Sequence, residues 1–187
     1  MSHYQVEGDD PCDWTDWEAA GRTRGGPCGR AAGSWERYEE DAAAAASLGA
    51  NALRFSVSWS RVEPRRGELG EAALERYARL AEQLSRLGLE PVVTLLHYTH
   101  PRWFHERTPW TSPASVDAFG RFAGRVARAL GPAARCWTVL NEPFVLVLGG
   151  YLDGQVPPGL ASGRDAARAF DNLLAAHEAA AAAIREA

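Results

Sequence analysis

The chain has 187 residues, of which 24% are charged and 46% belong to the hydrophobic set, and its formal net charge is −4. This length supports one sizeable core or at most two small domains, and the composition is typical of a globular protein in water. Acidic and basic residues are interspersed, which argues against nucleic acid or an anionic membrane surface as a partner. No apolar run approaches the roughly 20 residues of a membrane span.

The first stretch, to about residue 33, is rich in Gly, Asp, Pro and Trp and shows no clear periodicity, so we predict a loop. Its opening, MSHYQVEGDD, has neither the basic nor the apolar part of a signal peptide. The three cysteines, Cys12, Cys28 and Cys136, form no CxxC pair and are odd in number. We therefore expect a reduced, cytoplasmic setting.

Helical and strand patterns alternate over the rest of the chain. Helices are predicted over about 34–50, 70–89, 114–130 and 164–187, and strands over about 51–60, 90–98 and 135–142. Ser34 is expected to cap the first helix and Gly49 to end it. The second helix carries an apolar stripe made of Leu74, Tyr77, Leu80, Ala81, Leu84 and Leu87. The Pro- and Trp-rich residues 99–113 are predicted to form a loop.

The strands differ in the polarity of their faces. In residues 51–60 the apolar Leu53, Phe55 and Val57 alternate with polar residues that include Arg54, whereas residues 91–96 are almost continuously apolar. Regular alternation of helices and strands predicts parallel strands with right-handed crossovers. Both a (β/α)8 barrel and an open doubly wound sheet fit this order.

Polar residues at the ends of successive strands favour the barrel. These residues are Ser58, His97, Asn141 and Glu142. A barrel builds its active site from the carboxyl ends of several strands. No Gly-rich phosphate turn follows any predicted strand, which weakens the case for an open nucleotide-binding sheet.

Glu142 lies in an Asn-Glu-Pro sequence directly after the last predicted strand. A glycosidic bond breaks when an acid protonates the leaving oxygen while charge builds on the sugar ring. A glutamate at a strand tip suits that role when partial burial raises its pKa. Asn141 beside it can donate to a sugar hydroxyl. A surface turn explains the same three residues equally well.

Arg54 lies mid-strand on the polar face and must be paired, because an unpaired buried charge is very costly. It either holds a catalytic carboxylate ionised or makes a structural salt bridge. His97 either donates to a sugar hydroxyl or is a core histidine bonded to the backbone. His97, His100 and His105 lie close in sequence, but Pro101 interrupts any helix between them and HExxH is absent. We therefore expect no metal site, and glycoside hydrolysis by two carboxylates needs no cofactor.

Four segments, in this order, resemble glycoside hydrolase family 1, the β-glucosidase-like retaining glycosidases. They are YQVEG, WERYEEDAAAAASLGANALRFSVSWSRVEP, EPVVTLLHYTHPRWF and WTVLNEPF. The resemblance covers essentially the whole chain. It implies that residues 1–187 form the N-terminal part of a single TIM-barrel domain. About the first four β/α units would be present, with most of the first strand missing.

The resemblance also implies roles at individual positions. Glu142 would be the acid/base, and Asn141 would bind the sugar 2-hydroxyl. Gln5 and His97 would bind hydroxyls of the glycone, and Arg54 would orient and ionise the nucleophile. Tyr98 stands in the substrate subsite where many members carry Trp or Phe.

The family's nucleophile is a second glutamate on the seventh strand, and this chain ends before that strand. Glu63 and Glu106 lie in loops, and neither is in the family's nucleophile motif. We therefore expect the acid/base without its nucleophile, little or no activity in isolation, and a complementary C-terminal half-barrel as a candidate partner. The alternatives are an endo-acting barrel glycosidase, a non-catalytic sugar-binding module and a truncated fragment without a function of its own.

Overall fold

The computed structural model describes residues 2–107 and 109–187, so residue 108 of the predicted loop 99–113 lies outside the described residues. Its strands form one parallel sheet in the order β1-β2-β3, as the alternating pattern predicts. The strands are β1 (Ala52–Ser56), β2 (Glu90–Leu96) and β3 (Cys136–Leu140). The register pairs Arg54 with Val92 and Leu96 with Leu140, so the carboxyl ends of the strands lie at one edge of the sheet.

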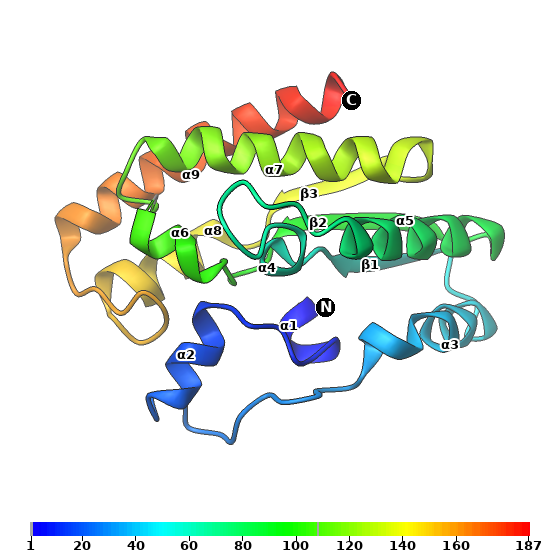
Figure 1. Ribbon diagram of the computed structural model, residues 1–187, viewed down its shortest axis with the longest axis horizontal. Coiled ribbons are helices and arrows are strands. Elements are labelled where there is room, and N and C mark those ends of the chain that lie inside the picture. The colour runs from blue at the N-terminus through cyan, green and yellow to red at the C-terminus, as the bar shows by residue number, and fades with distance from the viewer. Residues whose placement is uncertain (1, 108) are drawn as a thin grey trace.

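The four predicted helices are confirmed within a few residues. They are α3 (Ser34–Ser47), α5 (Glu71–Arg86), α7 (Ala114–Leu130) and α9 (Gly163–Arg185). In Figure 1, α7 and α9 lie on one side of the sheet, and the N-terminal segment with α1 (His3–Val6) and α2 (Asp13–Ala19) lies on the other. Helices α7 and α9 pack closely because their contact is made by small residues. A Cβ atom added to Gly120 would lie 3.4 Å from the Cβ of Ala179.

Several predicted loops, and the end of the strand predicted over 51–60, contain short helices that periodicity does not reveal. Besides α1 and α2, they are α4 (Trp59–Val62), α6 (Arg102–Arg107), η1 (Gly131–Ala133), α8 (Pro143–Val147) and η2 (Leu148–Leu152). Local side-chain contacts fix some of them. Thr15 accepts a hydrogen bond from the Cys12 amide at the start of α2, and Ser58 accepts one from the Arg61 amide at the start of α4. Helices of one or two turns are too short to show an apolar stripe.

Two finer predictions about helix ends are wrong. The chain enters α3 through Gly33, whose φ of +69° is left-handed, so Ser34 is the first helical residue and not the cap. Leu87 follows the end of α5 and is 37% exposed, because the apolar stripe rotates away from the core once the helix stops.

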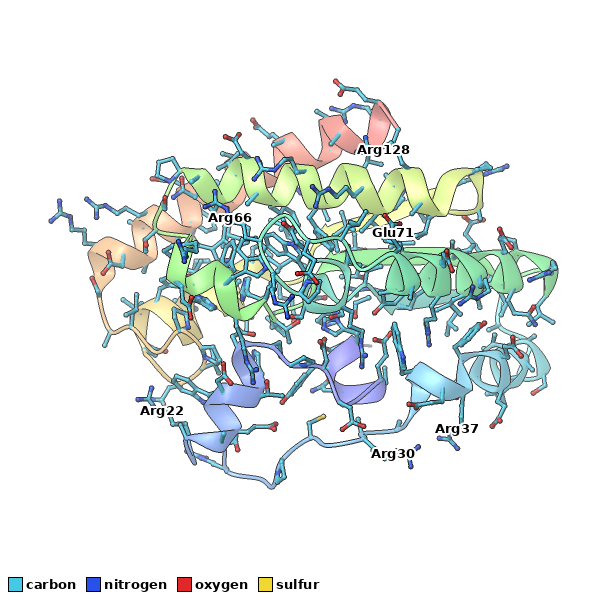
Figure 2. The ribbon with its side chains drawn as sticks, viewed as in Figure 1. Arg22, Arg30, Arg37, Arg66, Glu71 and Arg128 are labelled. Carbon is cyan, nitrogen blue, oxygen red and sulfur yellow. The ribbon has the colours of Figure 1, made fainter. Side chains whose placement is uncertain are left out.

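The core lies between the sheet and helices α5, α7 and α9. Trp59 is fully buried at its centre and stacks on Phe122, with ring centroids 5.0 Å apart. In the described part of the chain, β1 and β3 each have an unpaired edge. None of the described helices is both long and apolar enough to cross a membrane. The labelled Arg22 and Arg30 come from the N-terminal segment and Arg37 from α3, and all three are exposed at the outer edge of the molecule (Figure 2).

Candidate active site

The candidate site lies where β2 and β3 end. Glu142 follows β3 in a left-handed conformation with φ of +44°, and Tyr98 follows β2 with φ of +72°. The Tyr98 hydroxyl donates a hydrogen bond to Oε2 of Glu142. Asn141 Nδ2 donates to the same oxygen at 3.1 Å, and the backbone N–H of Asn141 donates to the Leu96 carbonyl at 2.9 Å. The parallel register thus brings two residues 44 positions apart into contact.

Arg54 reaches this group from β1. Its Nε donates to Thr94 Oγ1 at 2.8 Å, and its Nη2 donates to Asn141 Oδ1 at 2.6 Å. Since Asn141 Oδ1 accepts from the guanidinium, the Nδ2 group of the same amide points to Glu142. Arg54 is half-buried, and both acceptors are buried. The sequence does not single out Thr94, because a threonine inside an apolar strand is unremarkable.

The expectation that partial burial raises the pKa of Glu142 is wrong in the described part of the chain. Glu142 is exposed, and the hydrogen bonds from Tyr98 and then from Asn141 hold the pKa of its carboxyl below the ordinary value. These donors stabilise the ionised form, whereas little desolvation opposes them. Partial burial and the neighbouring Glu142 raise the pKa of Tyr98 to about 12, so its hydroxyl remains a donor at neutral pH.

A cavity of about 250 Å³ adjoins Tyr98. Gln5, His97 and Tyr98 line it together with Trp14 and Val145. Burial, together with nearby positive charges that include Arg54, lowers the pKa of His97 to about 4. A neutral imidazole is therefore presented at neutral pH. The structure thus brings Gln5, His97 and Tyr98 together around the cavity. It also connects Arg54, Asn141, Glu142 and Tyr98 by hydrogen bonds, so Tyr98 belongs to both groups.

Ser58 is not part of this site, although the sequence places it at a strand end with the others. Strand β1 ends at Ser56, and Ser58 begins α4, where it is fully buried and donates to Asp10. The buried carboxylates of the described residues all have partners of their own: Glu7 accepts from Tyr77, Asp10 from Ser58, Asp13 from His100 and Glu63 from Trp59. Glu106 is exposed and lines a different cavity, beside Asp16 and Arg102.

A second polar cluster combines His100 and His105 with Asp13, which lies far from them in the sequence. Oδ2 of Asp13 lies 3.0 Å from His100 Nδ1 and 3.0 Å from His105 Nε2, and these ligand-type atoms all lie within 4.8 Å of one another. Trp110 Nε1 donates to His100 Nε2 at 2.7 Å. An indole N–H can only donate, so His100 Nε2 carries a lone pair and Nδ1 carries the proton. That proton lies between Nδ1 and Asp13, where a metal ion would need a lone pair.

Comparison with known proteins gives a consistent result. The family described as Glycosyl hydrolase family 1 matches residues 3–187. Coniferin beta-glucosidase from Pinus contorta is 37% identical over 167 residues, which cover 84% of this chain and 33% of that protein. A beta-glycosidase from Pyrococcus horikoshii aligns with a TM-score of 0.93 and 32% identity over 100% of this chain and 44% of its own.

A family 1 b-glucosidase from Thermotoga maritima, solved in complex with isofagomine lactam, aligns with a TM-score of 0.94 and 30% identity over 100% of this chain and 44% of its own. The chain thus spans about a third of the length of the curated relative from Pinus contorta and 44% of these two solved structures. Because these structures are TIM-barrel glycosidases, the predicted incomplete (β/α)8 barrel is confirmed.

Proposed function

The chain belongs to glycosyl hydrolase family 1, and from that premise we propose that it carries the acid/base part of a retaining β-glycosidase site. The observation that carries the proposal is the connected group at the strand ends. Arg54 donates to Asn141, Asn141 donates to Glu142, and Glu142 also accepts from Tyr98. Three adjacent strands contribute to it, because Arg54 reaches from within β1 and the other three residues follow β2 and β3.

Glu142 is the proposed acid/base. In a retaining mechanism it protonates the glycosidic oxygen while a second carboxylate attacks the sugar, and it then takes a proton from the water that releases the sugar. An exposed carboxylate with a lowered pKa is suited to the second of these steps and poorly suited to the first. A nearby anionic nucleophile and exclusion of water would both raise the pKa of Glu142. We therefore propose that the site is completed by residues outside this chain.

The second carboxylate is proposed to come from those residues as well. Retaining glycosidases hold their two carboxyl groups about 5–5.5 Å apart. The buried acids of the described chain are bound by their own partners, and Glu106 lies at another cavity. Arg54 is proposed to orient and ionise the incoming nucleophile. A longer form of this chain and a complementary half-barrel are the two possible sources.

Gln5 and His97 are proposed to bind the glycone, and Asn141 the sugar 2-hydroxyl. The cavity beside Tyr98 supports this assignment, because Gln5 and His97 both line it. A neutral His97 can donate one hydrogen bond and accept another, which suits a sugar hydroxyl. The substrate class that fits is a terminal β-linked glycoside, and no cofactor is needed because two carboxylates suffice.

The proposal is tested with a chimera in which residues 3–187 replace the matching part of the Thermotoga maritima family 1 b-glucosidase. Hydrolysis of p-nitrophenyl β-D-glucoside is measured for the chain alone, the chimera, and the chimera with Glu142→Gln. The matched control is Glu106→Gln, an exposed glutamate outside the proposed site. We expect turnover by the chimera only, a fall of about 10²–10⁴-fold with Glu142→Gln, and little change with Glu106→Gln.

A chimera that folds and retains full activity with Glu142→Gln would contradict the role of Glu142. Activity of the chain alone that is lost with Glu142→Gln would mean that both carboxylates lie within these residues. Saturable sugar binding by the chain without turnover by a folded chimera would favour a sugar-binding module.

A further inference from the structure

Tyr98 and Glu142 share an uncommon backbone conformation. Among the described residues, the non-glycine residues with positive φ are Asp9, Ala31, Tyr98 and Glu142. A left-handed conformation costs free energy for a residue with a Cβ atom, and such conformations cluster at functional sites. Two of the four, Tyr98 and Glu142, follow adjacent strands, and their side chains hydrogen-bond to each other.

The hydrogen bonds to Glu142 use one of its two carboxylate oxygens. Tyr98 Oη and Asn141 Nδ2 both donate to Oε2, and no described residue donates to Oε1. Two donors on one oxygen restrict the rotation of the carboxylate. Oε1 is consequently the oxygen left for a ligand.

The Tyr98 side chain is itself held in place. Its ring is half-buried and meets the His97 ring edge-on, with centroids 5.4 Å apart. The hydroxyl remains protonated at neutral pH, since its pKa is about 12. The family resemblance places Trp or Phe at this position in many members, and neither side chain has a hydroxyl. An aromatic ring can pack in all three cases, whereas a hydroxyl that donates to Oε2 is available only to tyrosine.

We propose that Tyr98 is a positioning residue whose hydroxyl, together with Asn141, holds Oε2 of Glu142 so that Oε1 is the oxygen that exchanges the proton. The inference rests on the proposed function of Glu142. In the first step the Oε1–H bond breaks and the proton passes to the glycosidic oxygen. In the second step Oε1 takes a proton from the attacking water. Tyr98 keeps its own proton throughout, so no further acid or base is required.

The test uses the 187-residue chain and no substrate, so it is independent of whether the proposed activity is found. Glutamate side chains are labelled with ¹³C at Cδ and tyrosines at Cζ, and both are titrated by NMR. Comparison with Glu142→Gln assigns the Glu142 signal. Tyr98→Phe keeps the ring and removes the hydroxyl. The matched control is Tyr38→Phe, because Tyr38 donates to a different exposed glutamate, Glu39.

We expect Tyr98→Phe to raise the pKa of Glu142, because a donor to the ionised form is removed. Tyr38→Phe should leave the pKa of Glu142 as it is. Asn141, Arg54 and His97 also face Glu142 and lower its pKa, so the rise brings it only part of the way to the ordinary value. An unchanged Glu142 titration in a folded Tyr98→Phe chain would overturn the proposal.

A second measurement needs no Tyr98 variant. In the unchanged chain, the Tyr98 Cζ signal should titrate with the same midpoint as Glu142, and this titration should disappear in Glu142→Gln. A Tyr98 signal that does not respond to the protonation of Glu142 would overturn the proposal even if Tyr98→Phe failed to fold.

Discussion

The Arg54 guanidinium donates to the side-chain oxygen of Asn141 at 2.6 Å, although the two residues lie 87 positions apart. Arg54 belongs to β1 and Asn141 follows β3, so the contact crosses β2, where Thr94 accepts the second hydrogen bond of the arginine. The arginine therefore links β1 and β2 to the end of β3 and also sets which way the Asn141 side-chain amide faces. Sheet geometry and the proposed sugar contact of Asn141 thus depend on the same side chain.

Arg54→Met is expected to lower the free energy of unfolding by about 1–3 kcal/mol, because Asn141 and Thr94 would each lose a donor while they remain buried. The control is Arg102→Met, which removes an exposed ion pair with Asp16 and should change the free energy of unfolding by less than about 1 kcal/mol. Urea denaturation followed by tryptophan fluorescence compares the two. Equal losses would show that the Arg54 contacts contribute no more than a surface pair.

Asp13→Asn is expected to destabilise the chain strongly. Asp13 is buried and accepts hydrogen bonds from His100, His105 and the Trp14 amide. Breaking such a buried charged network costs about 3 kcal/mol. Asp16→Asn, three residues further along α2, is the matched control, because Asp16 is exposed. Thermal unfolding by circular dichroism should separate the two variants clearly, and similar melting temperatures would contradict the importance of the network.

The same network predicts that Zn²⁺ does not bind to Asp13, His100 and His105 in the folded chain. Trp110 holds the proton of His100 on Nδ1, so a metal ion would have to displace both that proton and the indole hydrogen bond. Calorimetry with Zn²⁺ should show no stoichiometric binding, and a chelator should not shift the melting temperature. Binding that is abolished by His105→Ala would disprove this prediction.

Strand and helix order could be predicted from the sequence because burial imposes a period on each long element. Leu74, Tyr77 and Leu84 are buried as the stripe predicts. The short helices could not be predicted in this way. Ser58 shows why: it continues the alternation of β1 in the sequence, yet it begins α4, because its side chain accepts from Arg61 and donates to Asp10. Hydrogen bonds between distant segments override local periodicity there.

Most residues of the candidate site could be predicted from the sequence, but the hydrogen bonds between them could not. Arg54 could be named because a charged side chain inside a strand is unusual, and Asn141 and Glu142 because they directly follow one. That Thr94 binds Arg54, and that Tyr98 binds Glu142, depends on the register of neighbouring strands. The exposure of Glu142, and hence its lowered pKa, depends on what covers the strand ends. A short sequence motif carries none of this information.

Stability is expected to fall as the pH is lowered from about 6.5 to about 4. The pKa of His97 is about 4 in the folded chain against an ordinary value of 6.5, because burial disfavours the imidazolium, with Arg54 and His3 adding to the effect and Glu142 opposing it. Between these two values the unfolded chain binds a proton that the folded chain does not. The free energy of unfolding therefore decreases as the pH falls through this window. Burial also lowers the pKa of His100, which adds a contribution of the same sign.

Asp13 acts in a different pH range. Burial alone would raise its pKa, but the hydrogen bonds from His100 and His105 hold the pKa of its carboxyl well below the ordinary 3.8. Its contribution to stability is thus present above about pH 4 and is lost only at lower pH.

The prediction for His97 is checked by urea denaturation at a series of pH values from 7.5 to 4. The free energy of unfolding should decrease less for His97→Gln than for the unchanged chain. His177→Gln, a substitution at an exposed position of α9, should leave the decrease as it was. An equal decrease in His97→Gln would show that His97 takes up its proton equally well in the folded and unfolded chain.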